Sequence, residues 1–143
     1  MRAQQPTVID PAYVIATLEK AGSTLLALPG TGWSPKLRTS SLDIVRTAIE
    51  SYGWTDQRIR PPVPSAAAIT DMDEVLGWIS FIPGERYVLR RIVGARSLVH
   101  PVTEKYLFPW RRLGAVLGAD HKAIQRWHRE GIDILVSALL RKA

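Results

Sequence analysis

Helical periodicity, broken at intervals by proline and glycine, is the feature that most constrains how this chain can fold. The first stretch opens on Asp10-Pro11, an N-cap residue followed by a proline at the first helical position, and closes on Pro29-Gly30. Between these ends, apolar residues recur at spacings of four, three and four: Val14, Leu18, Ala21 and Leu25. Strand signals are weak along the whole chain. The sequence therefore predicts an all-α fold.

Further stretches repeat the pattern of a capping residue, an apolar stripe and a break. Ser40 and Asp43 have the spacing of a capping box, Ser65 precedes the run AAAITDMDEVLGWISFI, and Pro83-Gly84 ends that run. Pro109 stands where a first helical residue belongs, and Gly118 is a natural helix stop. We expect about six helices, near residues 11–28, 41–53, 66–82, 85–97, 109–118 and 121–141.

Basic residues are concentrated in the second half of the chain. Residues 1–82 hold 7 Lys and Arg against 8 Asp and Glu, whereas residues 83–143 hold 12 against 5. We therefore divide the chain into an N-terminal helical part, 1–82, and a basic C-terminal part, 83–143. Such segregation is typical of a surface that meets a polyanion, although many small basic domains bind none.

Several classes of function have no signal in the sequence. There is no cysteine, and the three histidines do not have metal-ligand spacing with carboxylates. Asp71 and Glu74 share a helix face, but acids in the first half of a helix ordinarily complement its dipole. Apolar runs of about 18 residues are also absent. We expect a cytoplasmic protein that is not an enzyme, with no cofactor, metal, small-molecule ligand or membrane contact.

The stretch WRRLGAVLGADHKAIQRWHREG, residues 110–131, suggests two helices joined by a tight turn. Leu113 and Leu117 would face inward, Gly114 would allow close approach, and Gly118-Ala119-Asp120 would form the turn. Ile124, Trp127 and either Ile132 or Leu135 would anchor the second helix. This is the order of parts found in a helix-turn-helix.

The outward positions of these two helices carry hydrogen-bond donors and amides. Gln and Arg side chains can read base edges, while Lys and His can hold phosphates. The alternative is an ordinary solvated basic face, with His121 and His128 both at the surface. The candidate nucleic-acid contacts are His121, Lys122, Gln125, Arg126, Arg129, Arg111 and Arg112.

Residues from about Glu85 to Leu140 resemble region 4 of the sigma-70 family, in which an arginine-rich helix precedes a helix-turn-helix. The match follows the small and apolar positions of WRRLGAVLGADHKAIQRW. Three features depart from that family: the long connector SLVHPVTEKYLF, glycine rather than alanine at Gly114, and Gly131 within the second helix. No promoter-melting region is recognisable in residues 1–82, so the resemblance does not extend to a complete sigma factor.

A wider resemblance covers nearly the whole chain. The N-terminal LPG, the YGW of Tyr52 to Trp54, RPPVPSAAAI, MDEVLGWI and PWRRL are similar to a phage-associated alphaproteobacterial family of domains of unknown function. The chain also looks like the sigma-like half of gene-transfer-agent transcription activators. These resemblances imply a regulator that acts with DNA and RNA polymerase, by activating initiation or by antitermination.

Two other functions stay open at this point. A small terminase subunit would also bind DNA through a helix-turn-helix, but no heptad-like segment for oligomerisation follows it. A protein-binding module would dock a partner on the apolar run IDILVSALL without touching DNA. Side chains that could contact polymerase or another partner are Trp33, Trp54, Arg58, Arg60, Arg90 and Arg91; the two tryptophans could instead pin loops onto the core.

Overall fold

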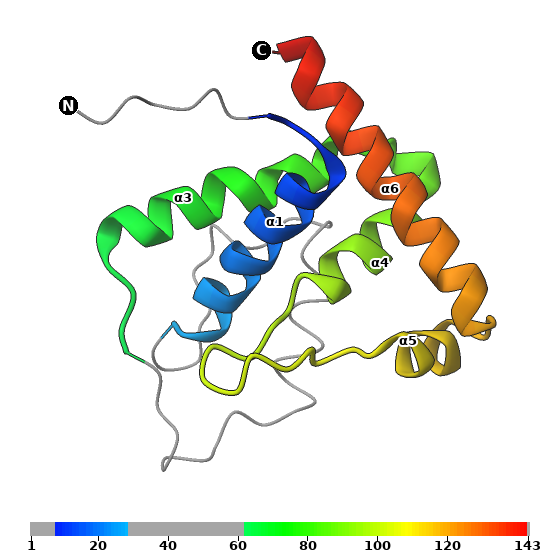
Figure 1. Ribbon diagram of the computed structural model, residues 1–143, viewed down its shortest axis with the longest axis horizontal. Helices are drawn as coiled ribbons and strands as arrows, with labels where there is room; N and C mark the ends of the chain where they lie inside the picture. The colour runs from blue at the N-terminus through cyan, green and yellow to red at the C-terminus, as the bar shows by residue number, and fades with distance from the viewer. Residues whose placement is uncertain (1–7, 29–61, 143) are drawn as a thin grey trace.

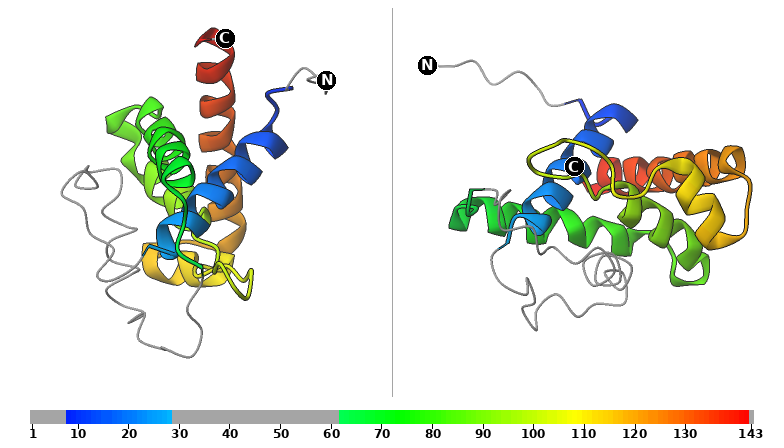
Figure 2. Two further views of the ribbon diagram at one scale, coloured as in Figure 1. Left: turned by 90° about the vertical axis from the view of Figure 1, so that its left-hand side faces the viewer. Right: turned by 90° about the horizontal axis from the view of Figure 1, so that it is seen from below.

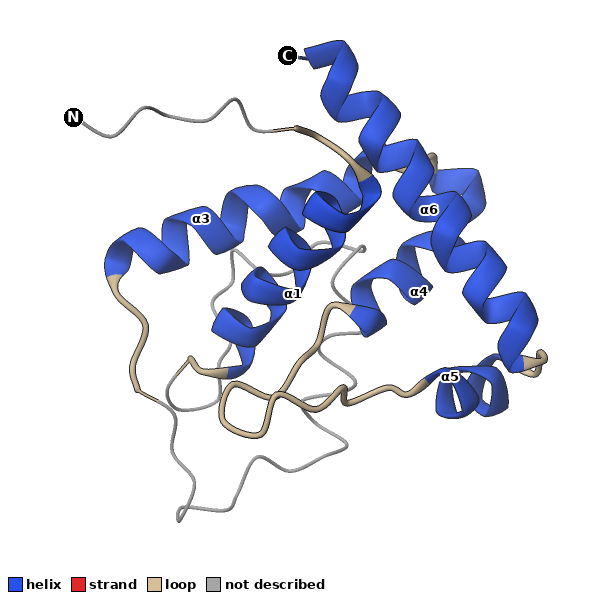
Figure 3. Ribbon diagram, in the orientation of Figure 1, coloured by secondary structure: helices blue, strands red, loops and turns tan. Residues whose placement is uncertain are grey.

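The computed structural model describes residues 8–28 and 62–142, and within these ranges the chain is built from helices (Figure 3). The predicted all-α class is confirmed. The helix expected at 41–53 lies outside the described residues, as do Trp33, Trp54, Arg58 and Arg60. The α-helices are α1 (Pro11–Leu26), α3 (Ala66–Gly77), α4 (Tyr87–Arg96), α5 (Trp110–Leu117) and α6 (His121–Lys142), and short 3₁₀ helices span Trp78–Phe81 and Gly84–Arg86.

Side-chain caps begin α1 and α3 where the sequence predicts. The Asp10 carboxylate accepts a hydrogen bond from the Tyr13 N–H at 2.7 Å, and the Ser65 hydroxyl accepts one from the Ala68 N–H at 3.1 Å. The α1 helix ends at Leu26, two residues before the predicted bound. Each capped N–H would otherwise lack a partner within the helix.

The predicted helix 66–82 is a regular α-helix only as far as Gly77. A 3₁₀ turn follows, and Arg90 of α4 donates hydrogen bonds to the carbonyl oxygens of Ser80 at 3.0 Å and Ile82 at 2.6 Å. These bonds satisfy carbonyls that a tightening helix end leaves without partners. The next helix is likewise entered through a 3₁₀ turn, so that α4 begins at Tyr87 rather than Glu85.

The helices are arranged around α1 and α6. The α1 helix packs against α3 on one side and against α6 on another, while α4 and α5 both pack against α6. Figure 1 shows α6 as the longest helix, with α5 set across its N-terminal end, and the two views of Figure 2 agree with this placement. The pair formed by α5 and α6 therefore occupies one end of the molecule.

One apolar core joins the N-terminal part to the basic part. It includes fully buried side chains from each of the described α-helices, among them Leu18, Met72, Ile92, Leu113 and Ile124. The backbones of α1 and α4 also meet closely, since a Cβ placed on Gly22 would lie 2.0 Å from the Ser97 carbonyl oxygen. Only glycine fits at that approach.

The connector 97–109 folds back on itself before it enters α5. Val99 and Tyr106 form an isolated antiparallel bridge, and the His100 N–H donates to the Lys105 carbonyl at 2.8 Å. Glu104 adopts a left-handed φ of 60° within the turn. The long connector that the sequence left without a predicted conformation is thus a small looped arm leading into α5 (Figure 1).

Candidate functional site

A three-residue turn joins α5 to α6. Gly118 adopts a left-handed φ of 70°, and the Ala119 N–H donates to the Gly114 carbonyl at 2.9 Å. A Cβ placed on Gly114 would lie 2.5 Å from the carbonyl oxygen of Ala119. The glycines at 114 and 118 therefore allow the chain to reverse within one turn of the end of α5.

The inward residues of the two helices lie where their spacing predicts. Leu113, Ile124 and Leu135 are fully buried, and Trp127 is half-buried against the core. Gly131, which the sequence marks as a weak point of the helix, faces α4: a Cβ there would approach the Val93 side chain to 2.7 Å. Glycine at this position lowers the helix propensity of α6 by about 1 kcal/mol, but the absence of a side chain allows α6 and α4 to pack closely.

The predicted nucleic-acid contacts lie on two faces of α6. Lys122, Arg126 and Arg129 are exposed and, at about 100° of rotation per residue, follow one stripe on the side away from the core. We call these three side chains the basic stripe. Gln125 is exposed near the edge of the stripe that turns toward α1, as shown by its place in the lining of a cavity with residues of α1.

The remaining predicted residues have more varied surroundings. Arg111 and Arg112 are exposed on the first turn of α5. His121 is half-buried at the start of α6, with its Nδ1 3.3 Å from the Asp120 carboxylate. Arg90, a candidate partner contact, uses its guanidinium to hold the backbone before α4, and its neighbour Arg91 is half-buried.

Arg96, which no sequence pattern marks as a candidate, occupies the junction of the connector and α5. Its guanidinium carbon lies 3.5 Å from the centroid of the Tyr106 ring and 3.8 Å from that of the Trp110 ring. It also donates a hydrogen bond to the Phe108 carbonyl at 3.3 Å. One side chain of α4 thus contacts three alternate residues of the segment leading into α5.

Contacts extend this junction to α1 and α6. The Tyr106 hydroxyl donates to the Glu19 carboxylate on α1, and this hydrogen bond is the main reason that the tyrosine pKa is raised. The Trp110 ring meets the His128 ring edge-on, with the ring centroids 5.1 Å apart. Burial lowers the pKa of Arg96, with the charge of Glu19 acting in the opposite direction.

His128 is less exposed than a position on a solvated basic face implies. Its ring is half-buried against Trp110, and burial, with a smaller contribution from the Arg96 charge, lowers its pKa to about 4. The imidazole is therefore neutral at physiological pH. His128 lies four residues after Ile124 and seven before Leu135, so helical spacing places it on the inner side of α6. This spacing is the sequence signal that predicts its partial burial.

A cavity of about 550 Å³ lies beside this junction, between α1, the connector, α5 and α6. We call it the Trp110 cavity. Arg96, Tyr106 and His128, whose pKa values are all shifted, belong to its wall. Such shifts gather at functional sites and at structural networks alike. The lining residues are Pro11, Ile15, Glu19, Arg96, Tyr106, Trp110, Gln125, His128, Arg129, Ile132 and Asp133.

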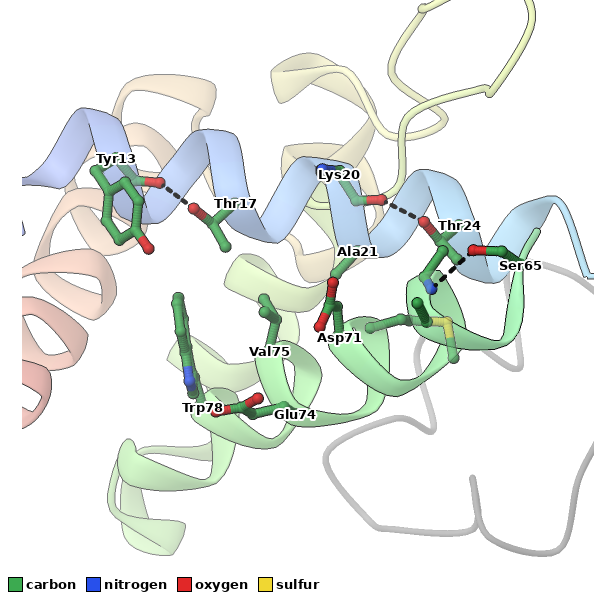
Figure 4. Close-up of a pocket in the computed structure, with 13 residues that line it drawn as sticks. Tyr13, Thr17, Lys20, Ala21, Thr24, Ser65, Asp71, Glu74, Val75 and Trp78 are labelled. Carbon is green, nitrogen blue, oxygen red and sulfur yellow. Dashed lines mark hydrogen bonds between the residues drawn. The ribbon is translucent and has the colours of Figure 1, made fainter. Parts of the chain in front are cut away.

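Another cavity, of about 480 Å³, lies between α1 and α3 (Figure 4). Tyr13 and Trp78 stand at one end of it, and Ser65 stands near the other. Asp71 and Glu74 line it and are exposed on α3, in agreement with their expected solvated position. Small and aliphatic side chains share the lining with these acids, and the hydroxyls of Thr17 and Thr24 donate to backbone carbonyls of α1.

The described part of the chain holds neither a candidate metal-binding group nor a candidate membrane-spanning helix. Across residues 8–28 and 62–142, acidic and histidine side chains form no group of three that could hold a metal ion. No helix within those ranges has the length and apolar character needed to cross a membrane.

A family described as a domain of unknown function, DUF6362, matches residues 28–135. The chain belongs to the DUF6362 family. The match includes α3, α4, α5 and most of α6, and with them the basic stripe. No curated protein and no solved structure matches the chain. The family description names no activity, so function has to be inferred from the residues themselves.

Proposed function

We propose that this DUF6362 protein is a transcription regulator of phage or gene-transfer-agent type that acts with RNA polymerase. Its α5–turn–α6 unit would serve as a helix-turn-helix similar to sigma-70 region 4, with α6 as the recognition helix. The regulator would activate initiation or act in antitermination.

The observation that carries this proposal is the pairing of a tight glycine turn with the exposed basic stripe. Gly114 and Gly118 allow the close reversal, and Lys122, Arg126 and Arg129 project from the first turns of α6. A helix-turn-helix reads DNA with the N-terminal part of its second helix, which is where these cations lie. Arg111 and Arg112 add two exposed cations at the start of α5.

The environment of the apolar run IDILVSALL favours DNA contact over docking of a partner on that run. Ile132 and Leu135 are buried in the core of this chain, and Ala138 is 9% exposed. Leu140, 54% exposed, remains accessible near the C-terminal end of α6. Most of the run therefore stabilises the chain itself.

Binding to duplex DNA tests the proposal in solution. Log Kd should change steeply with log salt concentration, because each phosphate that the protein neutralises releases condensed counterions. Lys122→Ala should reduce the salt slope by about one. Val116→Ala, at an exposed apolar position of α5, is the matched control and should leave the slope unchanged.

Base reading is tested separately from affinity. Arg126→Ala should lower the discrimination between a preferred duplex and an unrelated one by roughly tenfold, as expected for loss of one base contact. Equal losses on all duplexes would assign Arg126 to phosphate contact. Absence of salt-sensitive binding to any duplex would overturn DNA contact and favour a protein-binding module.

Genome-wide crosslinking of the tagged protein tests its role in the cell. Narrow peaks at promoters would support an activator that reads sequence, and signal spreading through a transcribed cluster would support travel with polymerase. A peak confined to a packaging start would contradict the proposal and favour a small terminase subunit.

A further inference from the structure

The Trp110 cavity opens beside the basic stripe of α6. Arg129 belongs to both, and Gln125 lines the cavity one turn before it on the same helix. Arg111 follows Trp110 directly on α5 and is exposed. A nucleic-acid strand held by these cations would therefore pass the mouth of the cavity.

The walls of the cavity combine planar groups with hydrogen-bonding groups. Tyr106, Trp110 and His128 supply rings, and Ile15 and Ile132 supply aliphatic surface. On the α6 side, Gln125 offers an amide, Arg129 offers donors and Asp133 offers acceptors. A nucleobase has the matching properties, because it is planar and carries donors and acceptors at its edge.

Charge in the lining provides no net attraction for an anion. The carboxylates of Glu19 and Asp133 accompany the guanidinium groups of Arg96 and Arg129, and the His128 ring adds no charge at neutral pH. A bare phosphate or an acidic peptide would be repelled by both carboxylates, whereas an uncharged ring would not. The volume of about 550 Å³ falls within the range of pockets that bind small molecules, so a single base would fit.

We propose that the Trp110 cavity accepts one unpaired nucleobase from nucleic acid bound along the basic stripe. The inference rests on the proposed function, since the same stripe holds the strand. A base within a duplex is stacked and paired, so the cavity would be filled only where a base is unpaired or extruded. The site would thus direct the protein to nucleic acid with a locally open strand.

Three duplexes of one sequence test this inference. The first is fully paired, the second carries a single bulged nucleotide, and the third carries the same bulge without its base. The expected result is about tenfold tighter binding of the bulged duplex than of the other two, because neither of those can stack an unpaired base in the Trp110 cavity. The abasic bulge separates the base itself from the flexibility that a bulge introduces.

Two substitutions on α6 distinguish the cavity from the stripe. Gln125→Ala removes an exposed amide of the cavity lining and should reduce the tenfold preference to about twofold. Lys122 is an exposed stripe residue one turn away, and Lys122→Ala should weaken binding to all three duplexes by the same factor. The preference for the bulged duplex should remain. Neither side chain is buried, so both variants should fold.

The outcomes separate failure of this inference from failure of the proposed function. Salt-sensitive and equal binding of all three duplexes would overturn the cavity proposal and leave DNA contact in place. Saturable binding of AMP or GMP, combined with equal binding of the duplexes, would also overturn it by assigning the cavity to free nucleotides. No binding to any duplex would remove both proposals together.

Discussion

At the scale of single residues, close backbone contacts distinguish glycines that pack from glycines that only weaken a helix. We expect Gly114→Ala to lower the free energy of unfolding by about 2 kcal/mol, because the added Cβ would lie 2.5 Å from the Ala119 carbonyl oxygen. Chemical denaturation followed by circular dichroism measures this change.

Gly77 provides the matched control. Its φ of −62° and ψ of −23° are helical, and a Cβ there meets no atom within 4 Å. Gly77→Ala should raise the free energy of unfolding by roughly 0.5–1 kcal/mol, since alanine restricts the unfolded chain. Equal effects of the two substitutions would contradict the close approach at the α5–α6 turn.

His128 is expected to make stability depend on pH. Because its folded pKa is about 4, below the ordinary value of 6.5, the unfolded chain takes up the proton first as the pH falls. Stability from this group is therefore complete above pH 6.5 and falls between pH 6.5 and 4, by about 3 kcal/mol. Thermal or urea unfolding at a series of pH values measures the loss.

The variant His128→Phe isolates this contribution from other titrating groups. Phenylalanine keeps a ring beside Trp110 but binds no proton, so the free energy of unfolding of the wild type should fall by about 3 kcal/mol relative to that of the variant between pH 6.5 and 4. His100, whose pKa is also lowered by burial, is retained in both proteins and cancels in the comparison. A difference that is constant from pH 7 to pH 4 would contradict the assignment.

At the scale of elements, Arg96 is expected to fix α5 relative to the rest of the chain. Lysine cannot lie flat against Tyr106 and Trp110 while also donating to the Phe108 carbonyl. We expect Arg96→Lys to raise hydrogen-exchange rates of α5 amides by about tenfold, with α3 amides unchanged. Hydrogen exchange read by mass spectrometry measures both helices in one experiment.

A substitution on the same helix controls for a general loss of stability. Arg91 is half-buried on α4, so Arg91→Lys should leave the difference between α5 and α3 as it is in the wild type. Uniform acceleration throughout the chain in Arg96→Lys would show that the guanidinium stabilises the whole fold rather than the position of α5.

The sequence predicts helices more reliably than the contacts between them. Caps at Asp10 and Ser65 and the stop at Gly118 act within a few residues, so they can be read locally. The 3₁₀ turn after Gly77 is accompanied by hydrogen bonds from Arg90, thirteen positions further along, and no local sequence pattern predicts them. In the same way, the periodicity of α6 predicts which side of the helix is buried but not which helices pack against that side.

The candidate site shows the same limit. The exposed positions of Lys122 and Arg126 follow from helical spacing. The contact of Arg96 with Trp110 requires the connector to fold back, and the hydrogen bond between Glu19 and Tyr106 joins residues that are distant in the chain. These long-range contacts build the Trp110 cavity, which is why sequence spacing alone did not reveal it.

At the scale of the whole molecule, α1 connects the N-terminal part to the basic part. It packs against both α3 and α6, Gly22 allows contact with the backbone at Ser97, and Glu19 reaches Tyr106. The apolar core is shared across these contacts. We therefore expect the described helices to unfold together, in a single transition.

Leu18→Ala tests this cooperativity, because Leu18 is a fully buried residue of α1, with 1% of its surface exposed. The cavity left by the missing methyl groups should lower the free energy of unfolding by about 2–5 kcal/mol. If the parts unfold together, the slowest-exchanging amides of α4 and α6 should accelerate by the same factor as those of α1. Val63→Ala, at a position 70% exposed, should change none of these rates. Faster exchange confined to α1 and α3 would instead mean that residues 83–143 fold as an independent unit, able to present the basic stripe without the N-terminal helices.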